Sequence, residues 1–239
     1  MTIKSYNDPM GQAILDKIRN KAEKEITILS PDFANDIITV DYLFRSYPDM
    51  PTLEKKALDH AKGRTLDAGA GAGSHALYLQ EKGLDVTAID TSPGAVEGMR
   101  ARGIKKAMEA DIFILEHQRF DTIFLLMNGI GLAGTPQGYI RLLEQLKKLL
   151  SPTGAVYFDT SDIRYLFDKP IPKWQKQPND NYYGIVPYQM KYKQHISPSF
   201  NWLYIDENMA EKLALESGYM FEIILRDEHY GYLARLIKK

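Results

Sequence analysis

A glycine-rich stretch, LDAGAGAG at residues 66–73, constrains the fold of this chain more than any other feature. It lies between a predicted strand at 65–68 and a predicted helix. Glycine at such a turn lets the backbone bend tightly and lets a ligand approach without meeting a Cβ. The start of the following helix offers unpaired backbone N–H groups to an acceptor. The stretch therefore predicts a ligand-binding turn, although a turn that only packs a helix on a strand is the alternative.

Short apolar strands alternate with amphipathic helices after this turn. Buried strands are expected at 86–89, 106–110, 122–127 and 155–158, and the clearest helix is expected at 136–150. Strands that alternate with helices form a mostly parallel sheet with helices on both faces. The pattern therefore predicts a doubly wound α/β fold.

The two ends of the chain depart from this alternation. Residues 1–51 are predicted to be an extension that packs on or caps the ligand site, with a helix over 10–24, and residues 52–239 are predicted to form the main domain. Five apolar residues repeat at helical spacing in the predicted N-terminal helix. They are Met10, Ala13, Ile14, Ile18 and Ala22.

Residues 161–205 interrupt the main domain after its fifth strand. They contain five prolines and many of the aromatic residues, and they predict a substrate or lid insertion. Two strands are expected there, at 184–192 and 200–205, joined by a turn at Ser197-Pro198. The chain then ends in two strands that are close in sequence and predict an antiparallel pair.

Charge and cysteine content narrow the function classes. The formal net charge is -1, and Lys and Arg are scattered, which does not favour nucleic acid or an anionic membrane as a partner. There is no cysteine, so disulfides, thiolate nucleophiles and cysteine-based zinc sites are excluded. The start of the sequence lacks the apolar core of a signal peptide, and no apolar run is long enough to span a bilayer. We expect a soluble, cytoplasmic monomer or homodimer.

Three acidic residues lie at or just after the ends of three successive predicted strands. Asp67 stands two residues before the first glycine, where a negative charge suits a cationic ligand better than a pyrophosphate. Asp90 ends the second strand, about 20 residues on, where an acid can accept hydrogen bonds from both ribose hydroxyls. Asp111 follows the third strand and can accept from an adenine amino group. Capping of a turn or a helix is the alternative role for Asp90 and Asp111.

The order of motifs LDAGAGAGSH, VTAIDTSPGAV, EADIF, FDTIFLLMNGIG and LLSPTGAVYFDTSD resembles class I S-adenosylmethionine-dependent methyltransferases. The resemblance covers roughly residues 52–160, and the last two strands fit the same fold. It implies a seven-stranded, mostly parallel sheet whose last strand is antiparallel. It also implies S-adenosylmethionine as cofactor and S-adenosylhomocysteine as product. The chain is most similar to bacterial members with an N-terminal extension and a late aromatic segment, here FNWLY at 200–204.

The resemblance implies a role for each residue of the glycine turn and the second strand. Gly69, Gly71 and Gly73 match the glycines that lie under the methionine part of the cofactor. Asp67 matches the acid that reaches the ammonium group, often through water. Asp90 matches the acid that binds the ribose.

The later motifs supply the remaining cofactor contacts. Asp111 and Ile112 match the adenine contacts, and Met127 and Asn128 match the stretch beside the methionine part and the methyl group. Three neighbours of these positions complete the predicted cofactor site. They are Ala70, His75 and Thr91.

Acceptor residues are expected outside these motifs. His195 and Asn128 are predicted to be catalytic, His195 as a base because it lies in the irregular aromatic segment. For each aromatic residue, the alternative is a structural role in packing a hairpin against the main domain. For Arg45, the alternative is an ordinary surface position. The residues predicted to contact a small-molecule acceptor are Tyr42, Arg45, Tyr188, Tyr192 and Trp202.

Several alternatives remain at this stage. The turn after the fourth strand reads Asn128-Gly129-Ile130-Gly131, without the Pro-Pro-aromatic motif of nucleic-acid amino methyltransferases, so base methylation is disfavoured. No metal is expected, although Asp159 and Asp162 leave room for a cation. A nicotinamide-dependent oxidoreductase is disfavoured by the glycine spacing and by Asp67. A non-catalytic module that binds the cofactor is the third possibility.

Overall fold

The computed structural model describes residues 7–21 and 23–239, and the chain divides into two compact units. Unit 1 holds the described residues up to Met50 together with Leu66–Asp111 and Pro187–Phe200. Unit 2 holds Pro51–Thr65, Ile112–Val186 and Asn201–Lys239. The predicted division into 1–51 and 52–239 stays a prediction.

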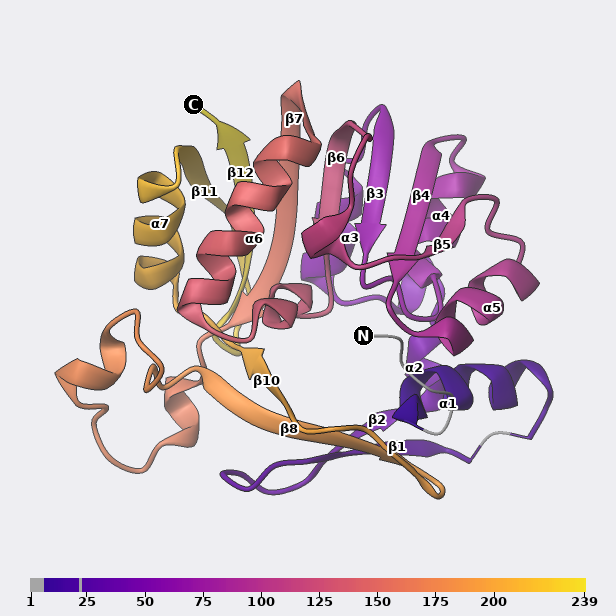
Figure 1. The fold of residues 1–239 in the computed structure, drawn as a ribbon, viewed down its shortest axis with the longest axis horizontal. Helices are drawn as coiled ribbons and strands as arrows, with labels where there is room; N and C mark the ends of the chain where they lie inside the picture. Colours follow the sequence, from indigo (N-terminus) through magenta and orange to yellow (C-terminus); the bar gives the residue numbers. More distant parts are fainter. Residues whose placement is uncertain (1–6, 22) are drawn as a thin grey trace. The chain divides into compact units, whose positions relative to one another are not determined.

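A seven-stranded sheet forms the body, in the order β11-β12-β7-β6-β3-β4-β5 (Figure 1). The pairs β4–β5 and β6–β7 are parallel, whereas β12 is antiparallel to both β7 and β11. The doubly wound α/β fold with an antiparallel last strand is thereby confirmed. The strands are β3 (Arg64–Ala68), β4 (Asp85–Asp90), β5 (Ala107–Glu109), β6 (Phe120–Leu125), β7 (Leu150–Ser161), β11 (Tyr219–Arg226) and β12 (Gly231–Lys238).

Helices pack on the strands of each unit, and side-chain caps set where several of them begin. The side chains of Ser92, Thr135 and Asp206 each accept a hydrogen bond from the backbone N–H of the third residue of the helix that follows. In unit 2, α6 lies in front of the strands and α3 behind them (Figure 1). The helices are α1 (Pro9–Ile18), α2 (Val40–Leu43), α3 (Thr52–Leu58), α4 (Ser74–Glu81), α5 (Pro93–Ala101), α6 (Pro136–Leu149) and α7 (Glu207–Glu216).

The N-terminal helix is shorter than the sequence pattern predicts. It ends at Ile18 because Asn20 adopts a left-handed conformation, with φ 56°, and the backbone N–H of Lys21 returns to the carbonyl of Asp16 at 2.7 Å. Ala22, which the pattern placed in this helix, lies outside the described residues.

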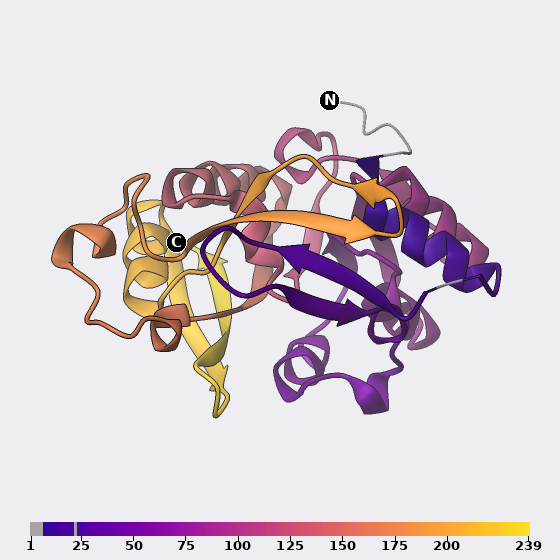
Figure 2. The same ribbon diagram turned by 90° about the horizontal axis from the view of Figure 1, so that it is seen from below.

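A second sheet has the order β10-β8-β1-β2, and β9 also pairs with β8. Its central pair joins segments that are far apart in the sequence: Thr27 of β1 lies opposite Lys191 of β8, and Figure 2 shows β1, β2 and β8 side by side. The turn after β8 lies at Lys193, with φ 53°, four residues before the predicted turn at Ser197. The strands are β1 (Glu25–Leu29), β2 (Asp36–Thr39), β8 (Ile185–Tyr192), β9 (His195–Ile196) and β10 (Phe200–Leu203).

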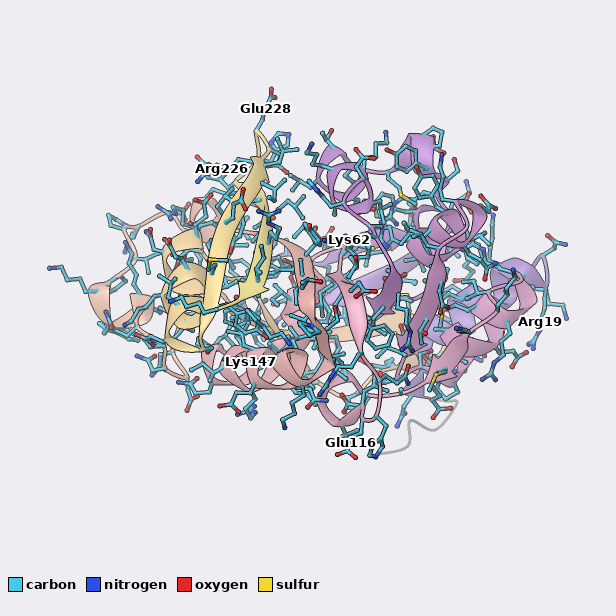
Figure 3. The ribbon with its side chains drawn as sticks, turned by 90° about the horizontal axis from the view of Figure 1, so that it is seen from above. Arg19, Lys62, Glu116, Lys147, Arg226 and Glu228 are labelled. Carbon is cyan, nitrogen blue, oxygen red and sulfur yellow. The ribbon has the colours of Figure 1, made fainter. Side chains whose placement is uncertain are left out.

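Charged side chains of both signs project from many different elements (Figure 3). Arg19, Lys62, Glu116, Lys147 and Arg226 illustrate this mixture. Within residues 7–21 and 23–239, no helix is long and apolar enough to cross a membrane.

Candidate functional site

The glycine turn follows β3 in unit 1 and is tied to the next strand. Gly69, Gly71 and Gly73 all have left-handed backbones, with φ of 73°, 55° and 78°. The backbone N–H groups of Gly69 and Ala70 both donate to the carbonyl of Ile89, at 2.9 and 3.0 Å. Residues that carry a Cβ rarely adopt this backbone conformation, which explains why the turn uses glycine at all three positions.

The three glycines differ in what surrounds them. A Cβ at Gly69 or Gly71 would meet no atom within 4 Å, whereas a Cβ at Gly73 would overlap the Ile104 side chain. Gly73 therefore allows close packing of the turn on its neighbours. Gly69 and Gly71 leave open space, so they are the positions where a ligand can approach the backbone.

Asp90 ends β4 and is held by two backbone groups. Its Oδ2 accepts from the N–H of Gly71 at 2.9 Å, and its Oδ1 accepts from the N–H of Ser92 at 2.9 Å. A carboxylate offers about four acceptor positions, so two remain for further donors. The side chain is half-buried, and burial, together with the charges of Asp8 and Asp67, raises the pKa of Asp90 against the opposing effect of these two hydrogen bonds.

Asp67 and Asp111 lie at the ends of the strands on either side of β4. Asp67 is only 2% exposed, and its Oδ2 accepts from the N–H of Ala76 at 3.1 Å, near the start of α4. Asp111 is half-buried and follows Ala110, whose N–H donates to the carbonyl of Asp90 at 3.0 Å. The structure therefore brings the three predicted acids to the ends of adjacent strands in unit 1. Asp67 supports the helix there, and its proposed role towards an ammonium group stays a prediction.

The remaining predicted cofactor positions differ in burial. Ala70 is half-buried in the turn, His75 is buried in the first turn of α4, and Thr91 is exposed after β4. Ile112, assigned to unit 2, is 5% exposed.

Tyr42 and Arg45 lie at α2 of the N-terminal segment. The guanidinium of Arg45 donates to the carbonyl of Tyr42 at 2.7 Å and lies 4.0 Å above the Tyr42 ring, so the two form one packed pair. The neighbouring carbonyl of Leu43 accepts from the Ser74 hydroxyl at 2.8 Å. This bond ties α2 to the helix that begins at the glycine turn, and the capping role of the extension stays a prediction.

Met127 and Asn128 form a strained turn after β6 in unit 2. Both are non-glycine residues in the left-handed region, with φ of 60° and 54°. The backbone N–H of Asn128 donates to Oδ2 of Asp159 at 3.1 Å. Both polar atoms of the Asn128 amide are buried without a hydrogen-bond partner in the structure. Strain of this kind and unpaired buried groups concentrate at functional sites.

Trp202 of β10 lies against the segment that follows this turn. A Cβ on Gly131 would overlap the indole ring, so glycine at 131 lets the ring pack directly on the backbone of η4 (Gly129–Ala133). Trp202 and the Asn128 turn are therefore attached to the same short segment of unit 2.

Tyr188, Tyr192 and His195 lie on the β8–β9 hairpin in unit 1. Tyr192 is 1% exposed, and its hydroxyl accepts from the N–H of Glu23 at 2.9 Å and donates to Asp16 at 3.3 Å. This geometry gives Tyr192 a structural role, joining β8 to the end of α1. Tyr188 is half-buried, and the partly exposed His195 has a buried Nδ1 without a hydrogen-bond partner.

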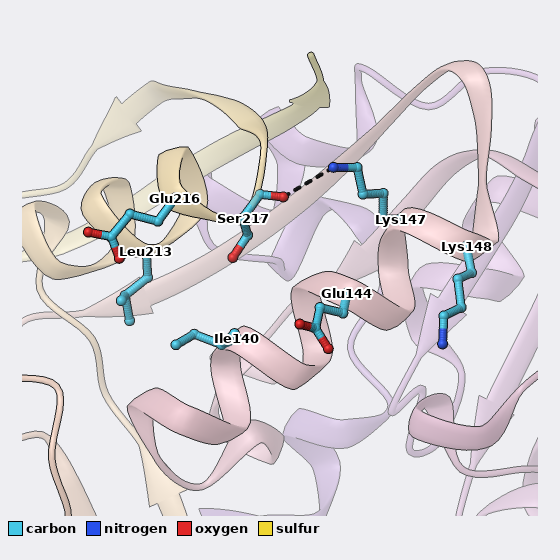
Figure 4. A pocket seen from close by; sticks show the side chains of 7 residues that line it. All are labelled: Ile140, Glu144, Lys147, Lys148, Leu213, Glu216 and Ser217. Carbon is cyan, nitrogen blue, oxygen red and sulfur yellow. Dashed lines mark hydrogen bonds between the residues drawn. The ribbon is translucent and has the colours of Figure 1, made fainter.

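A shallow groove lies elsewhere in unit 2, where α6 and α7 meet (Figure 4). Lys147 donates to the carbonyl of Ser217 there at 3.2 Å. None of the predicted site residues lines this groove. In the described parts of the chain, no group of three His, Cys, Asp or Glu residues is placed to hold a metal ion.

Asp8 caps α1 and precedes Pro9, and this pair of residues is typical of a helix start. In the structure it also reaches Ser92, which is 84 positions later in the chain. No local pattern could have revealed this contact, because it depends on how two helices pack.

The sequence matches the family described as "Methyltransferase domain" over residues 40–203. The chain is also similar to the crystal structure of a SAM-dependent methyltransferase from Bacteroides fragilis in complex with S-adenosyl-L-homocysteine, with a TM-score of 0.91 and 40% identity. That similarity covers 100% of this chain and 98% of the other.

Two further relatives are more distant. The cypemycin N-terminal methyltransferase of a Streptomyces species is 31% identical over 105 residues, which are 42% of this chain and 43% of that protein. The match therefore spans less than half the length of that relative. The PH0226 protein of Pyrococcus horikoshii OT3 has a TM-score of 0.59 at 20% identity, covering 79% of this chain and 89% of the other, and is a likeness of fold alone.

Proposed function

Because this chain belongs to the methyltransferase domain family, we propose that it transfers a methyl group from S-adenosylmethionine to a small-molecule acceptor. The observation that carries the proposal is the Asp90 carboxylate, which is held beside an open glycine turn with two acceptor positions to spare. The Bacteroides fragilis relative, solved with S-adenosyl-L-homocysteine, supports the same ligand class here.

The residues of unit 1 fit the adenosyl and methionine parts of this cofactor. Asp90 would accept from the two ribose hydroxyls, because its oxygens are already oriented by backbone N–H groups. Asp111 would accept from the adenine amino group. Gly69 and Gly71 would let the methionine part approach the backbone, since no atom occupies the space a Cβ would fill.

When bound, S-adenosylmethionine supplies an electrophilic methyl group on its sulfonium. The protein then has to position the acceptor and exclude water, which accounts for much of the acceleration in reactions of this kind. Asn128 is our candidate for orienting the acceptor, because its amide has a free donor and a free acceptor in a turn held by Asp159. His195 is our candidate base, and it is needed only if the acceptor atom carries a proton.

The charge distribution and the aromatic residues support a small acceptor. Charges of both signs are spread over the chain, and half-buried Tyr188 and Trp202 offer apolar faces. Amines are the first acceptors to test, because one relative is named an N-terminal methyltransferase. Cytoplasmic location and a monomeric or dimeric state stay predictions.

Thermal unfolding with S-adenosylmethionine, S-adenosylhomocysteine and NAD tests the proposal. A ligand at about 100 times its Kd adds about 2.7 kcal/mol of stability, which raises Tm by about 5–10 °C for a chain of this size. We expect this shift with the first two compounds, none with NAD, and none with Asp90→Ala. A shift with NAD alone would favour an oxidoreductase. Cofactor binding without methyl transfer to any acceptor in a panel of amines, hydroxyls and carboxylates would favour a non-catalytic module.

A further inference from the structure

We propose that Asp8, in the N-terminal segment, is a positioning residue for the cofactor: it holds Ser92, whose backbone N–H orients the Asp90 carboxylate. This inference rests on the proposed function. It makes α1, through its capping residue, a part of the cofactor site.

Asp8 bridges the N-termini of two helices in unit 1. The residue is 6% exposed, and its Oδ1 accepts from the N–H of Gly11 at 2.9 Å, which caps α1. Its Oδ2 accepts from the Ser92 hydroxyl at 2.7 Å and from the N–H of Gly94 at 3.1 Å, at the start of α5. A negative charge at the start of a helix is stabilised by the helix dipole, and here one carboxylate serves two helices.

Ser92 passes this constraint to Asp90. Its hydroxyl donates to Asp8 and accepts from the N–H of Ala95 at 2.9 Å, so both sides of the hydroxyl are engaged. The backbone N–H of the same residue donates to Oδ1 of Asp90 at 2.9 Å. The orientation of the Asp90 carboxylate therefore depends on Ser92 at one oxygen and on Gly71 at the other.

Close packing of α1 on α5 makes the contact possible. A Cβ at Gly94 would lie 2.7 Å from the Cα of Gly11, and a Cβ at Gly98 would overlap the side chain of Ile14. Two glycines on α5 and one on α1 therefore let the helices approach closely enough for Asp8 to reach Ser92.

The charge of Asp8 and the Ser92 hydrogen bond that Asp8 supports act on the pKa of Asp90 in opposite directions. Burial is the main cause of the raised pKa of Asp90, and the carboxylates of Asp8 from the N-terminal segment and Asp67 from β3 add to it. The N–H groups of Gly71 and Ser92 act in the opposite direction. Removing the Asp8 charge acts to lower the pKa of Asp90, but loss of the Ser92 N–H bond acts to raise it and is the larger of the two causes, so the pKa of Asp90 should rise.

The test is Asp8→Asn, with the affinity for S-adenosylmethionine and S-adenosylhomocysteine measured by calorimetry as a function of pH. Asparagine keeps the size but has one side-chain oxygen, which cannot accept from both the Gly11 N–H and the pair of donors on Ser92 and Gly94. We expect affinity near neutral pH to fall about tenfold, the effect of one lost charge-assisted contact. We also expect the pH at which affinity is half lost to move up, a change that a structural defect away from Asp90 does not produce.

Ile14→Ala is the matched control. Ile14 is 0% exposed and packs at the same helix interface, but it takes no part in the hydrogen bonds from Asp8 to Asp90. We expect this variant to lower Tm and to bind both ligands as wild type does, at a temperature where it is folded. Equal loss of affinity in Ile14→Ala and Asp8→Asn would overturn the proposal, because helix docking alone would then explain both.

Ser92→Ala cuts the same connection from the other side and tests the proposal if Asp8→Asn folds poorly. Ser92→Ala should weaken cofactor binding. The double variant should bind the cofactor no more weakly than the single variant with the lower affinity. Wild-type affinity and an unchanged pH profile in the folded single variants would overturn the proposal. Failure of the wild-type protein to bind either ligand would instead overturn the proposed function.

Discussion

The backbone N–H of Gly71 donates to Oδ2 of Asp90 at 2.9 Å, which joins the glycine turn after β3 to the acid that ends β4. The turn and the acid therefore keep a constant relation to each other in unit 1. Open space beside Gly71 leaves the remaining acceptor positions of the carboxylate available to a ligand. Changes to either residue should weaken cofactor binding.

Gly71→Ala should cost stability and cofactor affinity together. Alanine in the left-handed region costs about 1–2 kcal/mol, and its Cβ would enter the space that a ligand would use. Gly83→Ala is the control, because Gly83 also has a positive φ, 87°, and open space at its Cβ position. Both variants should lower Tm by similar amounts in thermal unfolding. Only Gly71→Ala should lose affinity for S-adenosylmethionine, and equal affinities in the two would contradict the placement of the ligand.

Affinity for S-adenosylmethionine should decline in acid at a higher pH than an ordinary aspartate would cause. Asp90 accepts hydrogen bonds from ribose hydroxyls best when it is ionised. Its pKa is raised above the usual 3.8, chiefly by burial. The stability of the ligand-free protein should depend on pH in the opposite direction. A carboxyl group whose pKa is raised on folding contributes stability to the folded state. This contribution is complete below the pKa of the unfolded chain and is lost as pH rises through the pKa of the folded protein. Calorimetric titrations and unfolding measured over the same pH series check both trends, and a pH-independent affinity would argue against Asp90 as the ribose ligand.

Asn128→Gly should reduce methyl transfer without loss of stability. Glycine keeps the left-handed turn and removes two buried polar atoms that have no partner, so Tm should stay equal or rise. Asn20→Gly makes the same change at an exposed left-handed position, with φ 56°. Turnover on an identified acceptor separates the two variants. Full activity in Asn128→Gly would remove the proposed role of the amide.

His195→Ala should keep cofactor affinity and lose turnover, because the ring is proposed to accept a proton from the acceptor. Its Nδ1 is buried without a partner in the structure, whereas His229 is exposed in the turn between β11 and β12. His229→Ala therefore serves as the control. An unchanged kcat in His195→Ala would exclude His195 as the base.

Tyr192→Phe should act on stability rather than on the acceptor. The hydroxyl bonds to Asp16 and to the N–H of Glu23, and losing a buried hydrogen bond costs about 1–3 kcal/mol. We expect a lower Tm and an unchanged KM for the acceptor. A raised KM at unchanged Tm would restore the acceptor role predicted from the sequence.

The alternation of strands and helices, the glycine turn and the acids at three strand ends could all be predicted from the sequence. Their signals are local: a glycine at positive φ, a Ser-Pro helix start and an apolar strand each depend on neighbouring residues. The chain order of Asp67, Asp90 and Asp111 then places them along one edge of a parallel sheet, because the carboxyl ends of parallel strands share that edge.

Tertiary structure alone decided the roles of Asp8 and Tyr192, and the pairing of β1 with β8. Asp8 reads as a helix cap in the sequence, and only the close approach of α1 to α5 brings its second oxygen to Ser92. Tyr192 reads as a ligand-facing aromatic, and only the pairing of β8 with β1 brings its hydroxyl to Glu23. Local periodicity predicts which face of an element is buried, but hydrogen bonds between distant segments depend on how those faces pack together.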